Sequence, residues 1–196
     1  MFEFKRVEEG RCRETTLQVN YLATALLAIL LLPVMKPSAV DTEPGRLTLI
    51  GSDAALTAPL PDPGEGHSLL DSSTAPKSSP EFVRADDVIV NVSNPGATRG
   101  TELIAKGNGP VAVRLFTGVM FGVLGRSAAD AARIYVHSSL VLGRESHGSY
   151  TEWVVRAWPP MMYTEAGRRL GDRLWDETMK ELSFAKVEEV LEGMKG

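Results

Sequence analysis

Serine and histidine side chains could support nucleophilic or metal chemistry, and their spacing limits which chemistry is available. Ser146 and His147 are adjacent in GRESHG, but this stretch does not satisfy the glycine–x–serine–x–glycine pattern of a hydrolase nucleophile. His67, His137 and His147 are the three histidines of the chain, and they are scattered without the spacing of metal ligands. We therefore expect neither a Ser–His–Asp triad nor a bound metal.

A glycine-containing stretch, TGVMFGVLG at residues 117–125, superficially resembles a dinucleotide-binding fingerprint because it follows the apolar run VAVRLF. Its glycines are spaced GxxxGxxG, whereas a phosphate-binding turn between a strand and a helix needs GxGxxG. The spacing and the absence of a strand–helix–strand context argue against a phosphate loop at this position.

Two apolar runs predict the elements that would position reactive groups. RLTLIGS at 46–52 ends in Ser52, and DVIVNVSNPG at 87–96 ends in the loop-forming residues Asn94, Pro95 and Gly96. Near-continuous apolar strands are typical of a parallel sheet that helices cover on both faces. The predicted class is α/β. Taken alone, Ser52 reads more simply as the polar end of a strand that begins a turn with Asp53.

The segment between these two strands is unusual. Residues 57–82 are rich in proline, serine and glycine, which predicts a flexible surface segment without a long helix. Parallel strands are normally joined through a crossover helix, so its apparent absence here is the oddest feature of the sequence. The prolines are Pro59, Pro61, Pro63, Pro76 and Pro80.

The second half of the chain predicts two helices and a third strand. A helix is expected within 125–142, with Ser127 as its N-cap and Asp130 three residues later. TEWVVRAW at 151–158 predicts a strand. Residues 164–193 form an amphipathic pattern that indicates a closing surface helix, broken near Ser183.

Residues 21–35, YLATALLAILLLPVM, predict a helix that is apolar on every side. The run is shorter than the about 20 residues of a membrane span, and Pro33 interrupts it. The preceding residues mix basic and acidic side chains, so the positive region of a signal peptide is missing, and secretion is the less favoured alternative. We expect no membrane span, and a helix buried between the sheet and a partner surface.

Composition sets further limits. The chain has 196 residues, a mass of 21.2 kDa, a net charge of -4 and a pI of about 5.5, which suits one domain over residues 1–196. It lacks the basic stripe of a nucleic-acid-binding protein, so no nucleic-acid partner is expected. The single Cys12 excludes an internal disulfide framework, and we expect a cytoplasmic protein.

Four stretches occur in an order that resembles the short-chain dehydrogenase/reductase family, in particular its fungal members similar to retinol dehydrogenases. They are LQVNYLATALLAILLLP, RLTLIGSDAAL, VIVNVSNPGATRGTEL, and the pair ARIYVHSSLVLGRESHGSY with EAGRRLGDRLWDE. The resemblance implies a partial Rossmann-like parallel sheet with flanking helices, equivalent to the C-terminal half of the family fold. It also implies an NADP or NAD cofactor across the carboxyl ends of the strands, and makes residues 117–125 part of a substrate lid.

The resemblance assigns roles to individual residues. Asn20 matches the family asparagine that holds a water in a proton relay, and Ser52 matches the serine that binds the substrate carbonyl or hydroxyl. Pro95 and Gly96 match the loop that packs against the nicotinamide. Either Thr98 or Thr101 matches the hydroxyl that touches the carboxamide or the diphosphate.

Three family motifs are absent from the sequence, among them the Asn-Ala-Gly motif of the fourth strand. The TGxxxGxG phosphate cradle would lie upstream of the matched stretches, which leads us to expect a truncated family member. The YxxxK pair, in which the lysine lowers the pKa of the tyrosine, would fall between Ser52 and Asp87, yet no tyrosine in the chain is followed by lysine at that spacing.

The resemblance implies an oxidoreductase that moves a hydride between NAD(P)(H) and a carbonyl or hydroxyl on a small hydrophobic metabolite, in fungal secondary metabolism. The alternative is a catalytically inactive relative that acts as an interaction protein. Because the family interface uses the helix at 21–35, we also expect homo-oligomers through that helix.

Overall fold

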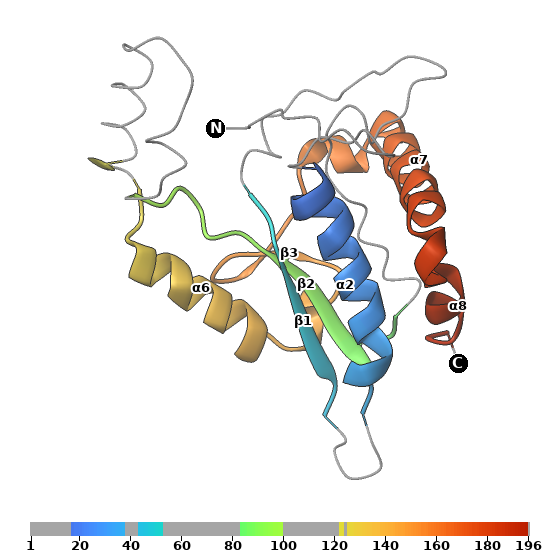
Figure 1. Cartoon of the computed structure of the whole chain (residues 1–196). Coiled ribbons are helices and arrows are strands. Elements are labelled where there is room, and N and C mark those ends of the chain that lie inside the picture. Colours follow the sequence, from blue (N-terminus) through green and yellow to red (C-terminus); the bar gives the residue numbers. More distant parts are fainter. Residues whose placement is uncertain (1–16, 38–42, 53–82, 100–121, 124, 196) are drawn as a thin grey trace.

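A mostly parallel sheet forms the centre of the protein. The computed structural model describes residues 17–37, 43–52, 83–99, 122–123 and 125–195 (Figure 1). Within these ranges the strand order is β1-β2-β3-β4, with β1–β2 and β2–β3 parallel and β3–β4 antiparallel. The strands are β1 Gly45–Ile50, β2 Val88–Ser93, β3 Tyr150–Thr151 and β4 Val155–Arg156. The predicted α/β class and parallel pairing of the first two strands are confirmed.

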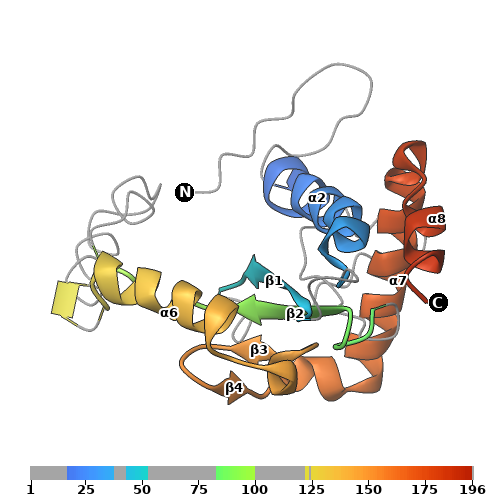
Figure 2. The same ribbon diagram turned by 90° about the horizontal axis from the view of Figure 1, so that it is seen from below.

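Helices cover both faces of this sheet (Figure 2). On one face lies a continuous helical segment made of η1 Gln18–Leu22, α2 Ala23–Leu31 and η2 Leu32–Met35. The C-terminal helices α7 Glu165–Glu181 and α8 Val187–Glu192, joined by η6 Ser183–Ala185, pack beside it. On the other face lies α6 Ala128–Leu140. Two short turns, η4 Arg144–Ser146 and η5 Pro160–Tyr163, complete the described elements.

Local sequence explains where these helices begin and break. The Ser127 side chain accepts a hydrogen bond from the Asp130 amide at 3.1 Å, which is the predicted N-cap of α6. Thr164 caps α7 in the same way through the amide of Gly167. The break between α7 and α8 falls at η6 and at Lys186, whose φ of 54° is left-handed. Both the α6 cap and the break near Ser183 are therefore confirmed.

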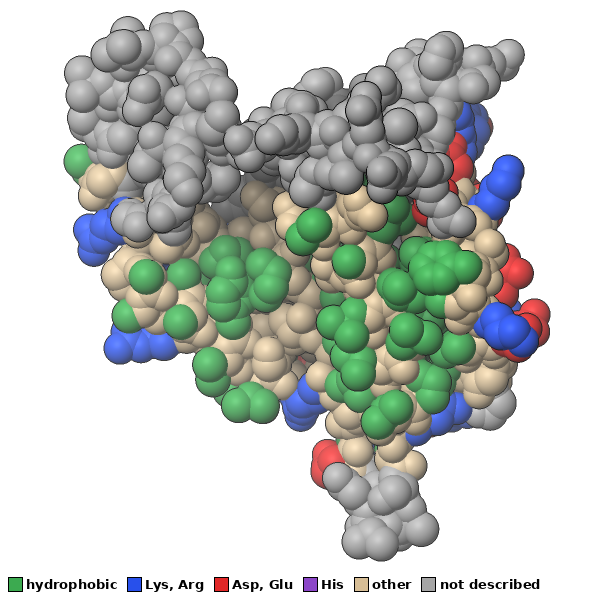
Figure 3. Space-filling view, in the orientation of Figure 1, with side chains coloured by type: hydrophobic (Ala, Val, Ile, Leu, Met, Phe, Trp, Pro, Cys, Tyr) green, Lys and Arg blue, Asp and Glu red, His purple; other side chains and the backbone are tan. Residues whose placement is uncertain are grey.

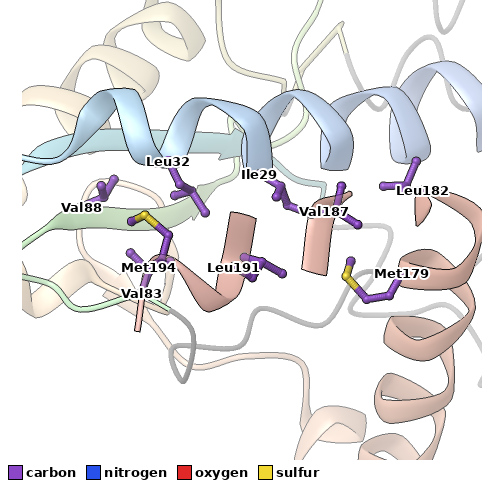
Figure 4. Packing of buried hydrophobic residues seen from close by; sticks show 9 residues of the cluster. All are labelled: Ile29, Leu32, Val83, Val88, Met179, Leu182, Val187, Leu191 and Met194. Carbon is purple, nitrogen blue, oxygen red and sulfur yellow. The ribbon is translucent and has the colours of Figure 1, made fainter. Parts of the chain in front are cut away.

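The apolar core lies between the sheet and the helices of the α2 face (Figure 4). Val88 of β2 is fully buried and meets α2 and α8. Because side chains alternate along a strand, Val88 and Val90 point to this face while Ile89 and Asn91 point toward α6. The buried cluster consists of Ile29, Leu32, Val83, Val88, Met179, Leu182, Val187, Leu191 and Met194.

The helix at 18–35 is buried on one side only. Leu22, Ile29 and Leu32 are buried, whereas Leu27 and Val34 are 60% and 81% exposed. Figure 3 shows the resulting group of hydrophobic side chains over α2. This outward side is the one that the expectation assigns to a partner surface, so burial between the sheet and a partner stays a prediction. By length and composition, the stretch from Gln18 to Met35 could also cross a membrane, so the expected lack of a span stays a prediction.

One predicted strand has a different form. Residues 151–158 do not make one long strand, because β3 and β4 are two-residue strands paired as an antiparallel hairpin through Tyr150↔Arg156 and Thr151↔Val155. The predicted flexible segment 57–82 lies outside the described residues. The single domain over 1–196 likewise stays a prediction.

Candidate functional site

The carboxyl ends of β1 and β2 meet at one edge of the sheet. The Gly51 amide donates a 2.8 Å hydrogen bond to the Ser93 carbonyl oxygen, so the pairing extends past Ile50. A Cβ at Gly51 would lie 2.7 Å from Val92 Cγ1 and 3.4 Å from Tyr150 Cε2, so the strands approach too closely there for a side chain. Ser52 follows directly and is exposed at this edge.

A tight turn at Pro95 and Gly96 leaves β2 at the same edge. The Asn94 side chain is buried, and its Oδ1 accepts a 3.0 Å hydrogen bond from the Gly96 amide. Gly96 has φ of 70°, a left-handed conformation that glycine adopts without steric cost. The hydroxyl of Thr98 donates back to the Gly96 carbonyl oxygen at 3.1 Å. Thr98 thus contributes to the turn, and Thr101, its alternative, lies outside the described residues.

Arg126 and Glu152 pack against this turn from two other segments. Arg126 Nη1 donates to the carbonyl oxygen of Pro95 at 3.3 Å, and Arg126 Nη2 lies 3.6 Å from a Glu152 carboxylate oxygen. Glu152 also accepts a 3.2 Å hydrogen bond from Asn94 Nδ2. Neither residue was among the sequence predictions, because nothing local marks a contact between positions so far apart in the chain.

A buried polar cluster lies beneath the edge, between β2, β3 and α6. Ser93 and Thr151 donate hydrogen bonds to Ser138 Oγ at 3.0 and 3.1 Å. Asn91 Nδ2 donates to the Ser138 carbonyl oxygen and to Ser146 Oγ, each at 3.0 Å. Ser146 is thus a buried member of this cluster. The polar residues at alternate positions of β2 were the sequence signal for this cluster.

Asn20 lies at the same end of the molecule. The helical segment that contains it runs back along β1, so its first turn is level with the carboxyl ends of the strands (Figure 1). Asn20 is exposed in the π-helical turn η1, which the amide of Ala23 closes by bonding the Gln18 carbonyl oxygen. Turns of this kind within α-helices are frequent at functional sites. Sequence and structure thus bring Asn20, Ser52, Pro95 and Gly96 to one end of the sheet.

The tyrosines show which phenols could act as a proton donor near neutral pH. Burial raises the pKa of Tyr21, whose hydroxyl pairs with Thr178 Oγ1 at 2.8 Å. Burial also raises the pKa of Tyr135. Both shifts move the pKa away from neutrality, so neither phenol has the lowered pKa that the lysine of a YxxxK pair gives its tyrosine.

The remaining two tyrosines have structural contacts. Tyr163 Oη accepts a hydrogen bond from the Trp158 amide at 3.0 Å. Tyr150 is buried, and its ring lies under Gly51 and packs against the Trp158 ring with 5.7 Å between the centroids. Of the described tyrosines, Tyr150 is the one in contact with the end of β1.

The edge fits one end of a nicotinamide dinucleotide. A half-exposed turn at Pro95 and Gly96 beside the exposed Ser52 offers a surface for a flat ring at the carboxyl ends of parallel strands. The described glycines of the edge do not form a phosphate cradle, because a Cβ at Gly96 would meet Arg126 and a Cβ at Gly51 would meet Val92. The described residues of this edge therefore offer a surface for a flat ring, and their glycines form no cradle for a diphosphate.

A parallel α/β sheet with polar groups at its carboxyl edge defines a Rossmann-like protein, and the sequence has relatives of that class. The short chain dehydrogenase/reductase mfmJ of Annulohypoxylon moriforme is 38% identical over 93% of this chain and 58% of its own length. The short chain dehydrogenase virL of Hypocrea virens is 38% identical over 93% of this chain and 59% of its own length. The short-chain dehydrogenase fogG of Aspergillus ruber is 33% identical over 92% of this chain and 59% of its own length.

The chain belongs to the short-chain dehydrogenase/reductase family. It spans somewhat less than two thirds of the length of these relatives, 58–59%. No family model matches the chain, and no solved structure matches it.

Proposed function

We propose that the protein is an NAD(P)-dependent oxidoreductase that interconverts a carbonyl and a hydroxyl group on a small hydrophobic metabolite. The observation that carries this proposal is the exposed Ser52 beside the Pro95–Gly96 turn, at the carboxyl edge of a parallel sheet in a chain of this family. When bound, the nicotinamide supplies or accepts the hydride at the substrate carbon. The oxygen of the substrate gains or loses a proton at the same time.

Each proposed site residue has one task. The Ser52 hydroxyl donates a hydrogen bond to the substrate oxygen and thereby orients the carbonyl and stabilises charge that develops on the oxygen. Asn20 holds a water that passes a proton to the edge. Pro95 and Gly96 pack against the nicotinamide ring, and Thr98 or Thr101 contacts its carboxamide or the diphosphate.

The same proposal includes NADP or NAD as the cofactor, a small hydrophobic metabolite as the substrate, a place in fungal secondary metabolism and a cytoplasmic location. The three relatives named above are fungal proteins, which supports the fungal setting.

A second candidate is a catalytically inactive relative that binds partners through α2. It is favoured by the lack of a YxxxK pair in the sequence and by the exposed apolar residues of the helix, Val19, Leu27, Leu30, Leu31 and Val34. In this case the sheet edge at Ser52 would be retained from active relatives but would catalyse no reaction. The helix would bind a second copy of the chain.

Kinetics with Ser52→Ala separate the two candidates. NADPH consumption is followed with decanal and benzaldehyde as carbonyl probes, and Ser139→Ala serves as the control because its hydroxyl bonds only the Tyr135 carbonyl oxygen within α6. We expect Ser52→Ala to lower kcat by about 100-fold and Ser139→Ala to leave it unchanged. A folded wild-type protein that consumes no NADPH with either probe would contradict the oxidoreductase proposal.

A further inference from the structure

A closed ring of polar contacts surrounds the turn at Pro95 and Gly96. Asn94 accepts from the Gly96 amide and donates to Glu152, Glu152 pairs with Arg126, and Arg126 donates to the Pro95 carbonyl oxygen. The three side chains come from three separate segments: the end of β2, the start of α6 and the β3–β4 hairpin. The ring therefore ties the turn to both neighbouring elements.

Backbone hydrogen bonds hold the main chain of Arg126 next to this ring. Its amide donates to the Ala97 carbonyl oxygen at 2.7 Å, and its own carbonyl oxygen accepts from the Arg99 amide at 3.0 Å. These two bonds make a short parallel bridge between Thr98 and Arg126. The main chain of Arg126 is therefore held directly beside the residues that follow the turn.

The guanidinium lies directly against the glycine of the turn. A Cβ at Gly96 would be 2.9 Å from Arg126 Nη1, so the two groups are in close contact. The partners are also shielded from water, since the side chains of Arg126 and Glu152 are 35% and 17% exposed. Salt screens such a partly buried pair less than an exposed one. The Arg133–Asp130 pair on α6, at 69% and 46% exposed, has the same chemistry without that shielding.

We propose that Arg126, acting through its contacts with Pro95 and Glu152, is a positioning residue that holds the Pro95–Gly96 turn in the conformation that receives a nicotinamide ring. The role in cofactor binding rests on the proposed function, whereas the effect on the turn does not. The turn would lose two of its restraints with Arg126→Met, namely the bond to Pro95 and the charge that holds Glu152 beside Asn94.

The first arm of the test needs no cofactor. Amide hydrogen exchange of Gly96 and Arg99 is measured by NMR in the full chain for wild type, Arg126→Met, Glu152→Gln and Arg126→Lys, with Arg133→Met as the matched control. We expect exchange at Gly96 to rise about tenfold in Arg126→Met and to recover partly in Arg126→Lys, which keeps the charge. The control should match wild type. Unchanged exchange at Gly96 in Arg126→Met would overturn the positioning role.

The second arm measures the dissociation constant of NADPH and the emission of bound NADPH for the same proteins. We expect Arg126→Met to raise the dissociation constant about fivefold, with a shifted emission and a melting temperature close to that of Arg133→Met. A protein that binds NADPH equally well with and without Arg126 would overturn the role in cofactor positioning. If wild type itself fails to bind, the proposed function fails, and the exchange arm still decides whether Arg126 holds the turn.

Discussion

The Gly51 amide and the Ser93 carbonyl oxygen are joined by a 2.8 Å hydrogen bond that carries the pairing of β1 with β2 one residue beyond Ile50, the last residue of β1. Ser52 directly follows Gly51, and Asn94 directly follows Ser93. This hydrogen bond therefore sets the spacing between the exposed serine and the turn that Asn94 begins. A hydroxyl and a turn held rigidly at one sheet edge are what a site for an oriented carbonyl requires.

Ser138→Ala should destabilise the protein, because it removes an oxygen that accepts from both Ser93 and Thr151. Buried hydroxyls that lose a partner cost about 1–3 kcal/mol in the free energy of unfolding. Urea denaturation measures that free energy. Ser139→Ala is the control, because the Ser139 side chain is only half-buried on α6. It should change the free energy of unfolding by less than about 0.5 kcal/mol. Equal effects of the two substitutions would contradict the account.

Tyr21 should make the folded protein sensitive to alkali. Its pKa in the folded state is raised above the ordinary 10.0 chiefly by burial, so the unfolded chain releases this proton first as the pH rises. The folded state then binds more protons, and the stability present below pH 10 is lost as the pH climbs through the folded pKa. Phenolate absorbance against pH should show a late-titrating tyrosine in wild type that Tyr21→Phe lacks, besides Tyr135, whose pKa burial also raises. A Tyr21→Phe variant with the same alkaline loss of stability would contradict this assignment.

Leu27→Glu should reduce self-association if the exposed side of α2 binds a second copy. Leu27 is 60% exposed within a group of apolar side chains, and a charge there would have to be desolvated in an interface. Sedimentation velocity of the full chain measures the oligomer. Val136→Glu, at a 56% exposed position of α6, is the matched control and should leave the oligomer intact. A monomeric wild type would contradict the oligomer proposal.

Local patterns predicted much of the fold. The two apolar runs became parallel strands, and the serine with an aspartate three residues later became the cap of α6. These features succeeded because each depends on neighbours in the sequence. The strand predicted at 151–158 failed, since whether a short β-rich run continues or folds back as a hairpin is decided by its partners in the sheet.

The site was predicted only in part. Ser52, Asn20, Pro95 and Gly96 came from the family resemblance. Ser52 and the turn follow the paired ends of β1 and β2, and Asn20 lies in η1, at the start of the helical segment that runs back along β1. Arg126 and Glu152 could not be predicted, because their contacts with the turn join residues 31 and 58 positions apart. Long-range polar contacts of this kind depend on the tertiary fold and leave no periodic trace in the sequence.

The central claim is that this edge of the sheet receives a nicotinamide cofactor, and direct binding of NADPH to the purified full chain tests it most directly. Isothermal calorimetry is run with NADPH and, in parallel, with NADH, on a sample whose folding is checked by circular dichroism. The account predicts saturable binding of NADPH or NADH with a stoichiometry near one. An absence of binding for both nucleotides in a folded sample would contradict it.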